Sequence, residues 1–126
     1  MKFTIDKHEK YVLLKLDEAK LDSEISPKLK TELILINAEG QRNIILDLSS
    51  IESVSDSSDL SSLLTGHRIC ENSGGVFIIT GLNDIILDLV AVSQLENVLT
   101  IVSKVEEAVD LIFMEEIEKE LSRESK

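Results

Sequence analysis

The pattern of apolar and polar residues at the start of the chain predicts two short strands. Apolar residues recur in the segments 3–5 and 11–16, which lie on either side of the polar segment 6–10. Two short apolar runs around a polar turn predict a β-hairpin.

A first helix is predicted after the hairpin. Ser26 is the expected N-cap, Pro27 suits the first helical position, and Gly40 lies near the expected end. The apolar positions between these residues have helical spacing: Leu29, Leu33 and Ile36.

Two compact apolar runs, residues 43–48 and 76–79, have the length and composition of strands covered on both faces. The polar residues 49–55 after the first run predict a turn. A second helix is expected between the runs, and it ends near residues 72–75. One face of this helix carries mostly apolar side chains: Leu60, Leu63, Leu64, His67 and Cys70.

The last third of the chain predicts a short helix at 85–92, a strand at 98–102 and a long C-terminal helix. The pattern leaves open whether the apolar face of the helix at 85–92 belongs to the core or is exposed to a partner. The C-terminal helix has one expected apolar stripe, and residues 117–126 form its charged end. The stripe consists of Val105, Ala108, Val109, Ile112, Phe113, Ile117 and Leu121.

The predicted element order is β-β-α-β-α-β-α-β-α. Strands that alternate with helices pair in parallel through right-handed crossovers, so the fold class is α/β, with one mixed sheet and helices packed on it. The 126 residues show no break in composition. We therefore expect a single domain over residues 1–126, with its core at about 3–115.

The chain is strongly acidic. Its 13 Lys and Arg residues face 24 Asp and Glu residues, which gives a formal net charge of −11. This charge disfavours binding to nucleic acid and to anionic membranes, and it suits a partner with a basic surface. The acidity is explained equally well by solubility alone.

Targeting signals and disulfides are not expected. Cys70 is the one cysteine and lies on an apolar helical face, which favours a buried structural thiol in a cytoplasmic protein. The N-terminal residues lack the apolar run of a signal peptide. No segment has the roughly 20 apolar residues that a membrane span requires.

Cofactor binding and catalysis are also not expected. The sequence has no glycine-rich phosphate loop, no zinc-ligand spacing and no HExxH pattern. His8 lies in the hairpin turn and is expected to be solvated. His67 is expected to be a partly buried structural residue, because serines and acids are so abundant that a match to a catalytic triad arises by chance. The sequence therefore predicts a protein that is not an enzyme.

The run from Ser55 to Leu60 marks the start of the second helix. Asp56 is the expected N-cap, and Asp59 at the third helical position complements the helix dipole. A good helix start explains every residue of the run. A functional interpretation adds that Ser57 lies at the exposed tip of the first turn, where a phosphate would change a small surface strongly without straining the fold.

Motifs in the same order along almost the whole chain, residues 3–115, resemble the STAS domain family, typified by bacterial anti-sigma factor antagonists. The central motif is Asp47-Leu48-Ser49-Ser50-Ile51 followed by Asp56-Ser57-Ser58 and Leu60. Leu21-Asp22, the segment 74–78 and the segment 105–108 are similar to the corresponding family segments. Ser93-Gln94-Leu95 stands where the family often has Ser-Gly-Leu.

The resemblance implies a regulatory protein that binds a partner. In the regulatory members of the family, a serine of the Asp-Ser-Ser run is phosphorylated by an anti-sigma factor that is also a serine kinase of the GHKL ATPase type. Phosphorylation ends the interaction, and a PP2C-type phosphatase reverses it. The phosphoacceptor position matches Ser57. The resemblance places the partner surface at Asp22, Asp56, Ser57, Ser58, Asp59 and Ser61. A monomer that forms a complex with its partner is the simplest expectation for an isolated acidic domain.

One position departs from the family pattern. Asp59 stands where the family usually has glycine, and it adds bulk and a fixed negative charge close to the acceptor hydroxyl. Such a charge disfavours a neighbouring phosphate. It therefore motivates an alternative, a non-phosphorylated STAS accessory subunit of a lipid-transport ABC complex.

Overall fold

A mixed sheet forms the centre of the computed structural model, which describes residues 1–124. Within this range five strands follow the order β1-β2-β4-β6-β7. Only β1 and β2 are antiparallel, and the other neighbours pair in parallel. The strands span Phe3–Lys7 (β1), Val12–Leu16 (β2), Ile44–Asp47 (β4), Phe77–Thr80 (β6) and Thr100–Val102 (β7). The α/β fold class and the opening hairpin are confirmed.

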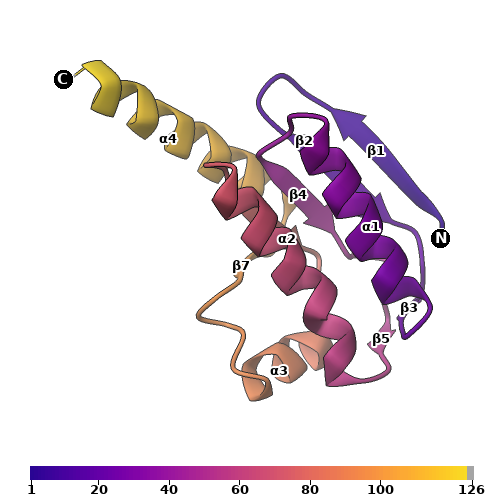
Figure 1. Ribbon diagram of the computed structural model, residues 1–126. Helices are drawn as coiled ribbons and strands as arrows, with labels where there is room; N and C mark the ends of the chain where they lie inside the picture. The colour runs from indigo at the N-terminus through magenta and orange to yellow at the C-terminus, as the bar shows by residue number, and fades with distance from the viewer. Residues whose placement is uncertain (125–126) are drawn as a thin grey trace.

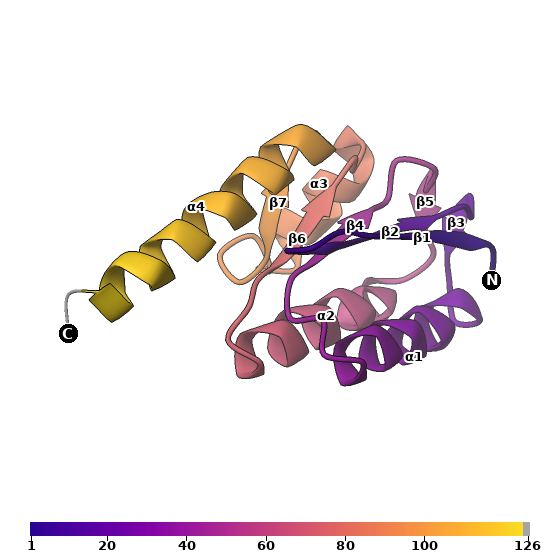
Figure 2. The same cartoon turned by 90° about the horizontal axis from the view of Figure 1, so that it is seen from above.

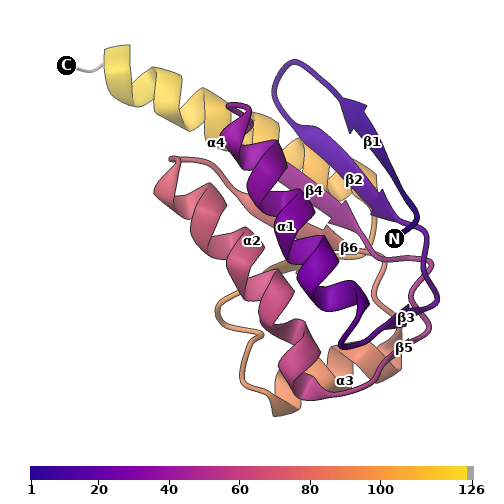
Figure 3. The ribbon, with the colours of Figure 1, turned by 45° about the vertical axis from the view of Figure 1, so that its right-hand side comes forward.

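Helices cover both faces of this sheet. The helices α1 (Ile25–Ala38) and α2 (Ser61–Asn72) lie side by side on one face, and α4 (Val105–Glu124) lies on the other, as Figures 1 and 2 show. The short helix α3 (Asp84–Val92) lies at one end of the sheet, beside the start of α2 (Figure 3).

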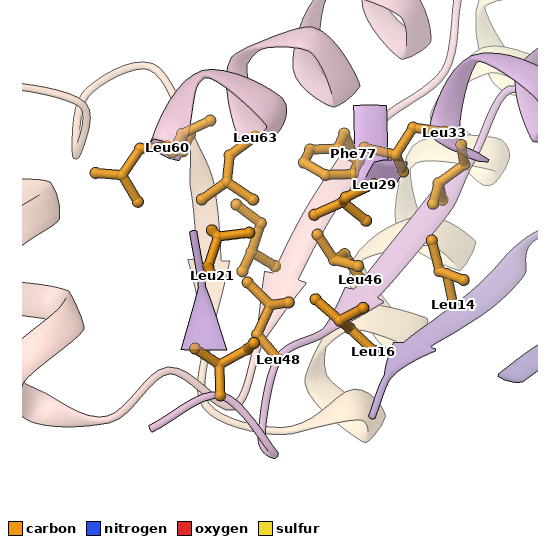
Figure 4. Close-up of a cluster of buried hydrophobic side chains, with 14 of the residues drawn as sticks. Leu14, Leu16, Leu21, Leu29, Leu33, Leu46, Leu48, Leu60, Leu63 and Phe77 are labelled. Atoms are coloured by element: carbon orange, nitrogen blue, oxygen red, sulfur yellow. The ribbon is translucent and has the colours of Figure 1, made fainter. Parts of the chain in front are cut away.

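The core follows the two-residue periodicity of the central strands. Leu14 and Leu46 point to the face covered by α1 and α2, where they pack with Leu29, Leu63 and other buried aliphatic residues (Figure 4). Ile45, which precedes Leu46 and pairs with Leu13, points to the opposite face and packs against Ala108 and Ile112 of α4. The apolar runs therefore have buried residues on both faces, as expected of parallel strands.

A small second sheet was not expected from the sequence. The strand β3 (Lys20–Leu21) pairs in parallel with β5 (Ser53–Val54), and β5 lies within the segment 49–55 that was predicted to be only a polar turn. The amide of Ser55 also donates to the carbonyl of Leu21 over 3.0 Å. This pairing brings the entry to α1 beside the entry to α2.

The start of α1 corrects a second prediction. The helix begins at Ile25, and the carboxylate of Asp22 accepts hydrogen bonds from the amides of Glu24 (3.0 Å) and Ile25 (2.9 Å). Ser26 is not the N-cap. It is buried, and its hydroxyl donates to the carbonyl of Asp59 over 2.9 Å.

The predicted apolar stripe of the C-terminal helix is divided in the structure. Ala108 and Ile112 are buried against the sheet, whereas Phe113, Ile117 and Leu121 are 45%, 55% and 59% exposed. Ile117 follows Ile112 by five residues, which is about 140° around an α-helix, so it does not face the sheet. The helix also extends beyond the sheet (Figure 2) and is ordered to Glu124, with residues 125–126 outside the described range.

Candidate functional site

The turn from Asp56 to Leu60 connects β5 to α2. Asp56 has an extended backbone, and residues Ser57–Leu60 form a single 3-10 turn that continues into the α-helix at Ser61. Because β5 is paired with β3, the start of this turn has a fixed position at one end of the molecule (Figure 3).

Two carboxylates hold the turn in place. Asp56 is the N-cap, as predicted, and accepts hydrogen bonds from the amide (3.0 Å) and hydroxyl (2.5 Å) of Ser58. Asp59 accepts in return from the amide of Asp56 over 3.1 Å, which completes a capping box. The hydroxyl of Ser58, and then its amide, hold the pKa of Asp56 below its ordinary value.

The two serines of the turn have different surroundings. The hydroxyl of Ser58 is committed to Asp56. The side chain of Ser57 is exposed and has no hydrogen-bond partner among residues 1–124. Ser57 is therefore the serine of this turn whose hydroxyl is free to react with an approaching group.

Asp59 does not have the surroundings expected from the sequence. It is only 7% exposed, and its carboxylate is directed into the turn, toward the amide of Asp56. Its carbonyl accepts from the hydroxyls of Ser26 and Ser62. The side chain therefore stabilises the turn, and it does not present its bulk to a partner.

Asp22 lies at the same end of the molecule. It is half-buried and caps α1, and its neighbour Leu21 pairs with Val54 just before the turn. The hydrogen bond from Ser26 to Asp59 joins the starts of the two helices. The structure thus places Asp22, Asp56, Ser57, Ser58, Asp59 and Ser61 in one region, although the charged groups of Asp22 and Asp59 are engaged in capping.

A groove of about 600 Å³ runs beside the turn. Its first wall carries the side chains of Ser57, Ser58, Leu60, Ser61 and Leu64. Its second wall is formed by α3 and the residues after it: Leu89, Val92, Ser93 and Leu95. The sequence had left open whether the apolar face of α3 is exposed to a partner. The signal for this exposure was the composition of the helix, in which only Asp84 and Asp88 are polar.

The two histidines and the cysteine lie outside this region, and the contacts of each are accounted for by the fold. The imidazole of His67 is 2.8 Å from Glu71, and that of His8 is 2.9 Å from Asp6 and stacks on Tyr11. Cys70 is buried, as predicted, and burial raises its pKa to about 12, so the thiol is unreactive at neutral pH.

Within residues 1–124, no cluster of three or more His, Cys, Asp and Glu side chains is arranged to hold a metal ion. None of the helices in that range is both long enough and apolar enough to span a membrane.

Comparison with known families assigns the fold. The family model described as STAS domain matches residues 2–108, which is 107 of the 126 residues. The chain belongs to the STAS domain family. No curated protein sequence matches the chain.

Solved structures give the same fold. An anti-sigma-factor antagonist domain protein from Planctomyces limnophilus is 14% identical, with a TM-score of 0.76, and the match covers 87% of this chain and 97% of that one. A variant of RsbS from Moorella thermoacetica is 22% identical, with a TM-score of 0.70 and coverage of 98% and 99%. The phosphorylated form of SpoIIAA, a Bacillus cell-fate determinant, is 19% identical, with a TM-score of 0.65 and coverage of 88% and 99%.

Proposed function

We propose that this protein is a partner-binding regulator of the anti-sigma factor antagonist type, controlled by phosphorylation of Ser57 in a partner-switching pathway. Its partners are an anti-sigma factor with serine kinase activity of the GHKL ATPase type and a PP2C-type phosphatase. The protein itself catalyses no reaction and acts in the cytoplasm.

The observation that carries the proposal is the free hydroxyl of Ser57. Ser57 occupies the acceptor position of the family motif, its side chain is exposed, and no described residue binds its hydroxyl. Ser58, the next residue, donates its hydroxyl to Asp56 and is less accessible to a kinase for that reason. Of the two serines in the turn, Ser57 is therefore the one whose hydroxyl is free for a kinase.

Electrostatics explains how phosphorylation would end binding. The acceptor hydroxyl has to face the γ-phosphate of the ATP bound to the kinase. A phosphoserine at the same place carries a charge of about −1.5 to −2 and faces the phosphates of the nucleotide product. Like charges opposed at an interface cost several kcal/mol, which corresponds to a loss in affinity of about a hundredfold or more.

The experiment measures binding of the purified GHKL-type serine kinases of the source organism, one at a time. We expect one kinase to bind wild type and Ser57→Ala with similar affinity and to lose at least about a hundredfold with the phosphorylated protein. Ser57→Asp is expected to reproduce part of this loss. Ser55→Asp is the matched control, because it places the same charge two residues earlier, outside the groove walls. Equal binding by all forms would contradict the phosphoswitch.

The alternative role in a lipid-transport ABC complex rests on the negative charge of Asp59. The buried carboxylate of Asp59 accepts from the amide of Asp56, so its part in the capping box explains its presence without this alternative role. No other feature of the described residues favours this alternative.

A further inference from the structure

The solvent-facing side of α3 is apolar. Seven of its nine residues are apolar, but only Ile86 and Val90 are buried in the domain. Ile85 is 74% exposed and Val92 is 80% exposed, more than any other large apolar side chain of the described residues. A helix that is apolar on all sides is normally buried, so this helix has a surface that the domain itself does not cover.

Two of the exposed residues, Ile85 and Val92, form a ridge together with Leu89, which is half-buried and also packs against the core. Ile85, Leu89 and Val92 have the spacing i, i+4 and i+7, which places them along one side of the helix. We call these three residues the α3 ridge. The groove that contains Ser57 lies on one flank of the ridge. A second hollow, of about 370 Å³, lies on the other flank and reaches Ser53 and Val54.

Acidic residues outnumber basic ones in the segment of the chain that contains α3, and two of them lie on the helix itself. From residue 43 to residue 103 the sequence has one basic residue other than histidine, Arg68. The same segment has eight acidic residues: Asp47, Glu52, Asp56, Asp59, Glu71, Asp84, Asp88 and Glu96. Asp84 and Asp88 lie on α3 itself, are exposed, and form no salt bridge within residues 1–124. The charge next to the ridge is therefore uncompensated in the free protein.

We infer that the α3 ridge is the second half of the partner interface and that it binds aliphatic side chains of the kinase bordered by Lys and Arg. This inference rests on the proposed function and adds to it the surface that provides affinity. The apolar ridge matches an aliphatic partner surface, and the unpaired carboxylates match basic groups around it. A second copy of this chain fits poorly, because each copy carries a net charge of −11.

The two halves of the interface have different roles: the α3 ridge provides affinity, and Ser57 controls release. Phosphorylation of Ser57 does not alter the exposed aliphatic side chains of the ridge, so their contribution to binding is the same in both forms. The groove joins them to Ser57, so that a partner seated on the ridge brings its nucleotide to the acceptor hydroxyl. Removing apolar surface from the ridge should therefore weaken binding of the unphosphorylated protein, whereas Ser57→Ala should not.

The experiment measures dissociation constants of the same kinase for Ile85→Gln, Val92→Gln and the control Leu121→Gln. Leu121 is 59% exposed near the C-terminal end of α4, which extends away from the sheet and from α3 (Figure 2), and its replacement removes a similar aliphatic group. We expect each ridge variant to bind about tenfold more weakly or worse, and the control to bind like wild type. Unchanged thermal unfolding is expected for all three, because these side chains are exposed.

A charge variant tests the basic border. Asp88→Lys should slow association at low salt, and the difference from wild type should shrink as salt screens the charges. Asp110→Lys, at an exposed position of α4, is the matched control and should associate like wild type. An equal effect of both substitutions would show that only net charge matters and would overturn the basic border.

The outcomes separate this inference from the function on which it rests. If wild type binds a kinase and is released by phosphorylation, but both ridge variants bind equally well, the ridge assignment alone is wrong. If wild type binds none of the kinases, the proposed function is wrong and the inference falls with it. A wild-type dimer in light scattering that Val92→Gln dissociates would show that a second copy covers the ridge, and would also overturn the inference.

Discussion

Two neighbouring serines differ at the scale of single residues. The hydroxyl of Ser58 is held by the carboxylate that also caps the turn, so phosphorylation there would break the cap. The hydroxyl of Ser57 has no such role among the described residues. The Asp-Ser-Ser motif alone does not show which serine is free; the hydrogen bonds of the cap do.

Asp59 is expected to contribute to the stability of the turn. Asp59→Gly removes the carboxylate that accepts from the amide of Asp56, and it adds backbone freedom to the unfolded chain. The free energy of unfolding should fall by about 1–2 kcal/mol in urea titrations at pH 7. Asp59→Asn, which keeps an oxygen acceptor, should lose less. Equal stability of Asp59→Gly and wild type would show that the capping box contributes nothing.

The residue scale also shows where local patterns mislead. The Asp56 N-cap and the position of Asp59 followed from sequence, because a capping box involves residues only three positions apart. The role of Ser26 did not follow, because its hydroxyl binds the carbonyl of Asp59, 33 residues away. The carboxylate of Asp22 instead accepts from the first amides of the helix that Ser26 was expected to cap. A local sequence pattern does not reveal the long-range bond between Ser26 and Asp59.

At the scale of elements, the contact between α2 and β6 depends on a glycine. Gly66 lies in the interior of α2, where replacement by alanine ordinarily stabilises a helix by up to about 1 kcal/mol. A Cβ atom at this position would lie only 2.5 Å from the ring of Phe77, which is buried. Overpacking costs about 1–3 kcal/mol and should prevail. Gly66→Ala should therefore lower the urea midpoint, and a higher midpoint would contradict this packing.

The contact between α4 and the residues that precede the central strand β4 should make stability depend on pH. Both carboxylate oxygens of Glu116 accept from the guanidinium of Arg42 over 2.7 Å, and Asn43 donates to the same carboxylate. The Arg42 hydrogen bonds, more than any other cause, hold the pKa of Glu116 below its ordinary value, and partial burial opposes them. A lowered pKa in the folded state means that the ionised form stabilises the fold.

Glu116→Gln should accordingly destabilise the protein by about 1 kcal/mol at pH 7, a modest value because Arg42 is 41% exposed. The contribution of Glu116 is complete above its unfolded pKa of about 4.3 and is lost as the pH falls through the lower folded pKa. Urea titrations of both proteins from pH 7 to pH 3 should therefore converge at the acid end. A difference that persists undiminished at pH 3 would contradict the ionic interaction.

The elements themselves were largely predictable from sequence, and the exceptions have a common cause. Strands β2, β4 and β6 are buried runs with strong local signals. The two-residue strands β3 and β5 exist only because they pair with each other. The stripe of α4 looked continuous because Phe113 and Ile117 are apolar, but helix rotation and the limited width of the sheet leave them exposed. The pairing of β3 with β5 and the exposure of these α4 residues depend on which elements lie next to them in space, and a local sequence pattern does not give this.

At the scale of the whole molecule, phosphorylation should alter binding without altering the fold. Ser57 is exposed and unpartnered in the described structure, so its phosphate disrupts no tertiary contact. Changes at such surface positions are usually within about 0.5 kcal/mol, which corresponds to a shift of about 2 °C in Tm for a domain of this size. Calorimetry of both forms checks this value. A much larger decrease would indicate that the modification unfolds the turn.

The most direct test of the account is phosphate transfer by the cognate kinase to wild type, Ser57→Ala and Ser58→Ala, with the modified residue located by mass spectrometry. We expect one phosphate at Ser57 in wild type, none in Ser57→Ala, and continued labelling of Ser58→Ala at Ser57. Labelling of Ser57→Ala to the same extent as wild type would contradict the account, because Ser57 would then be only a residue of the helix start.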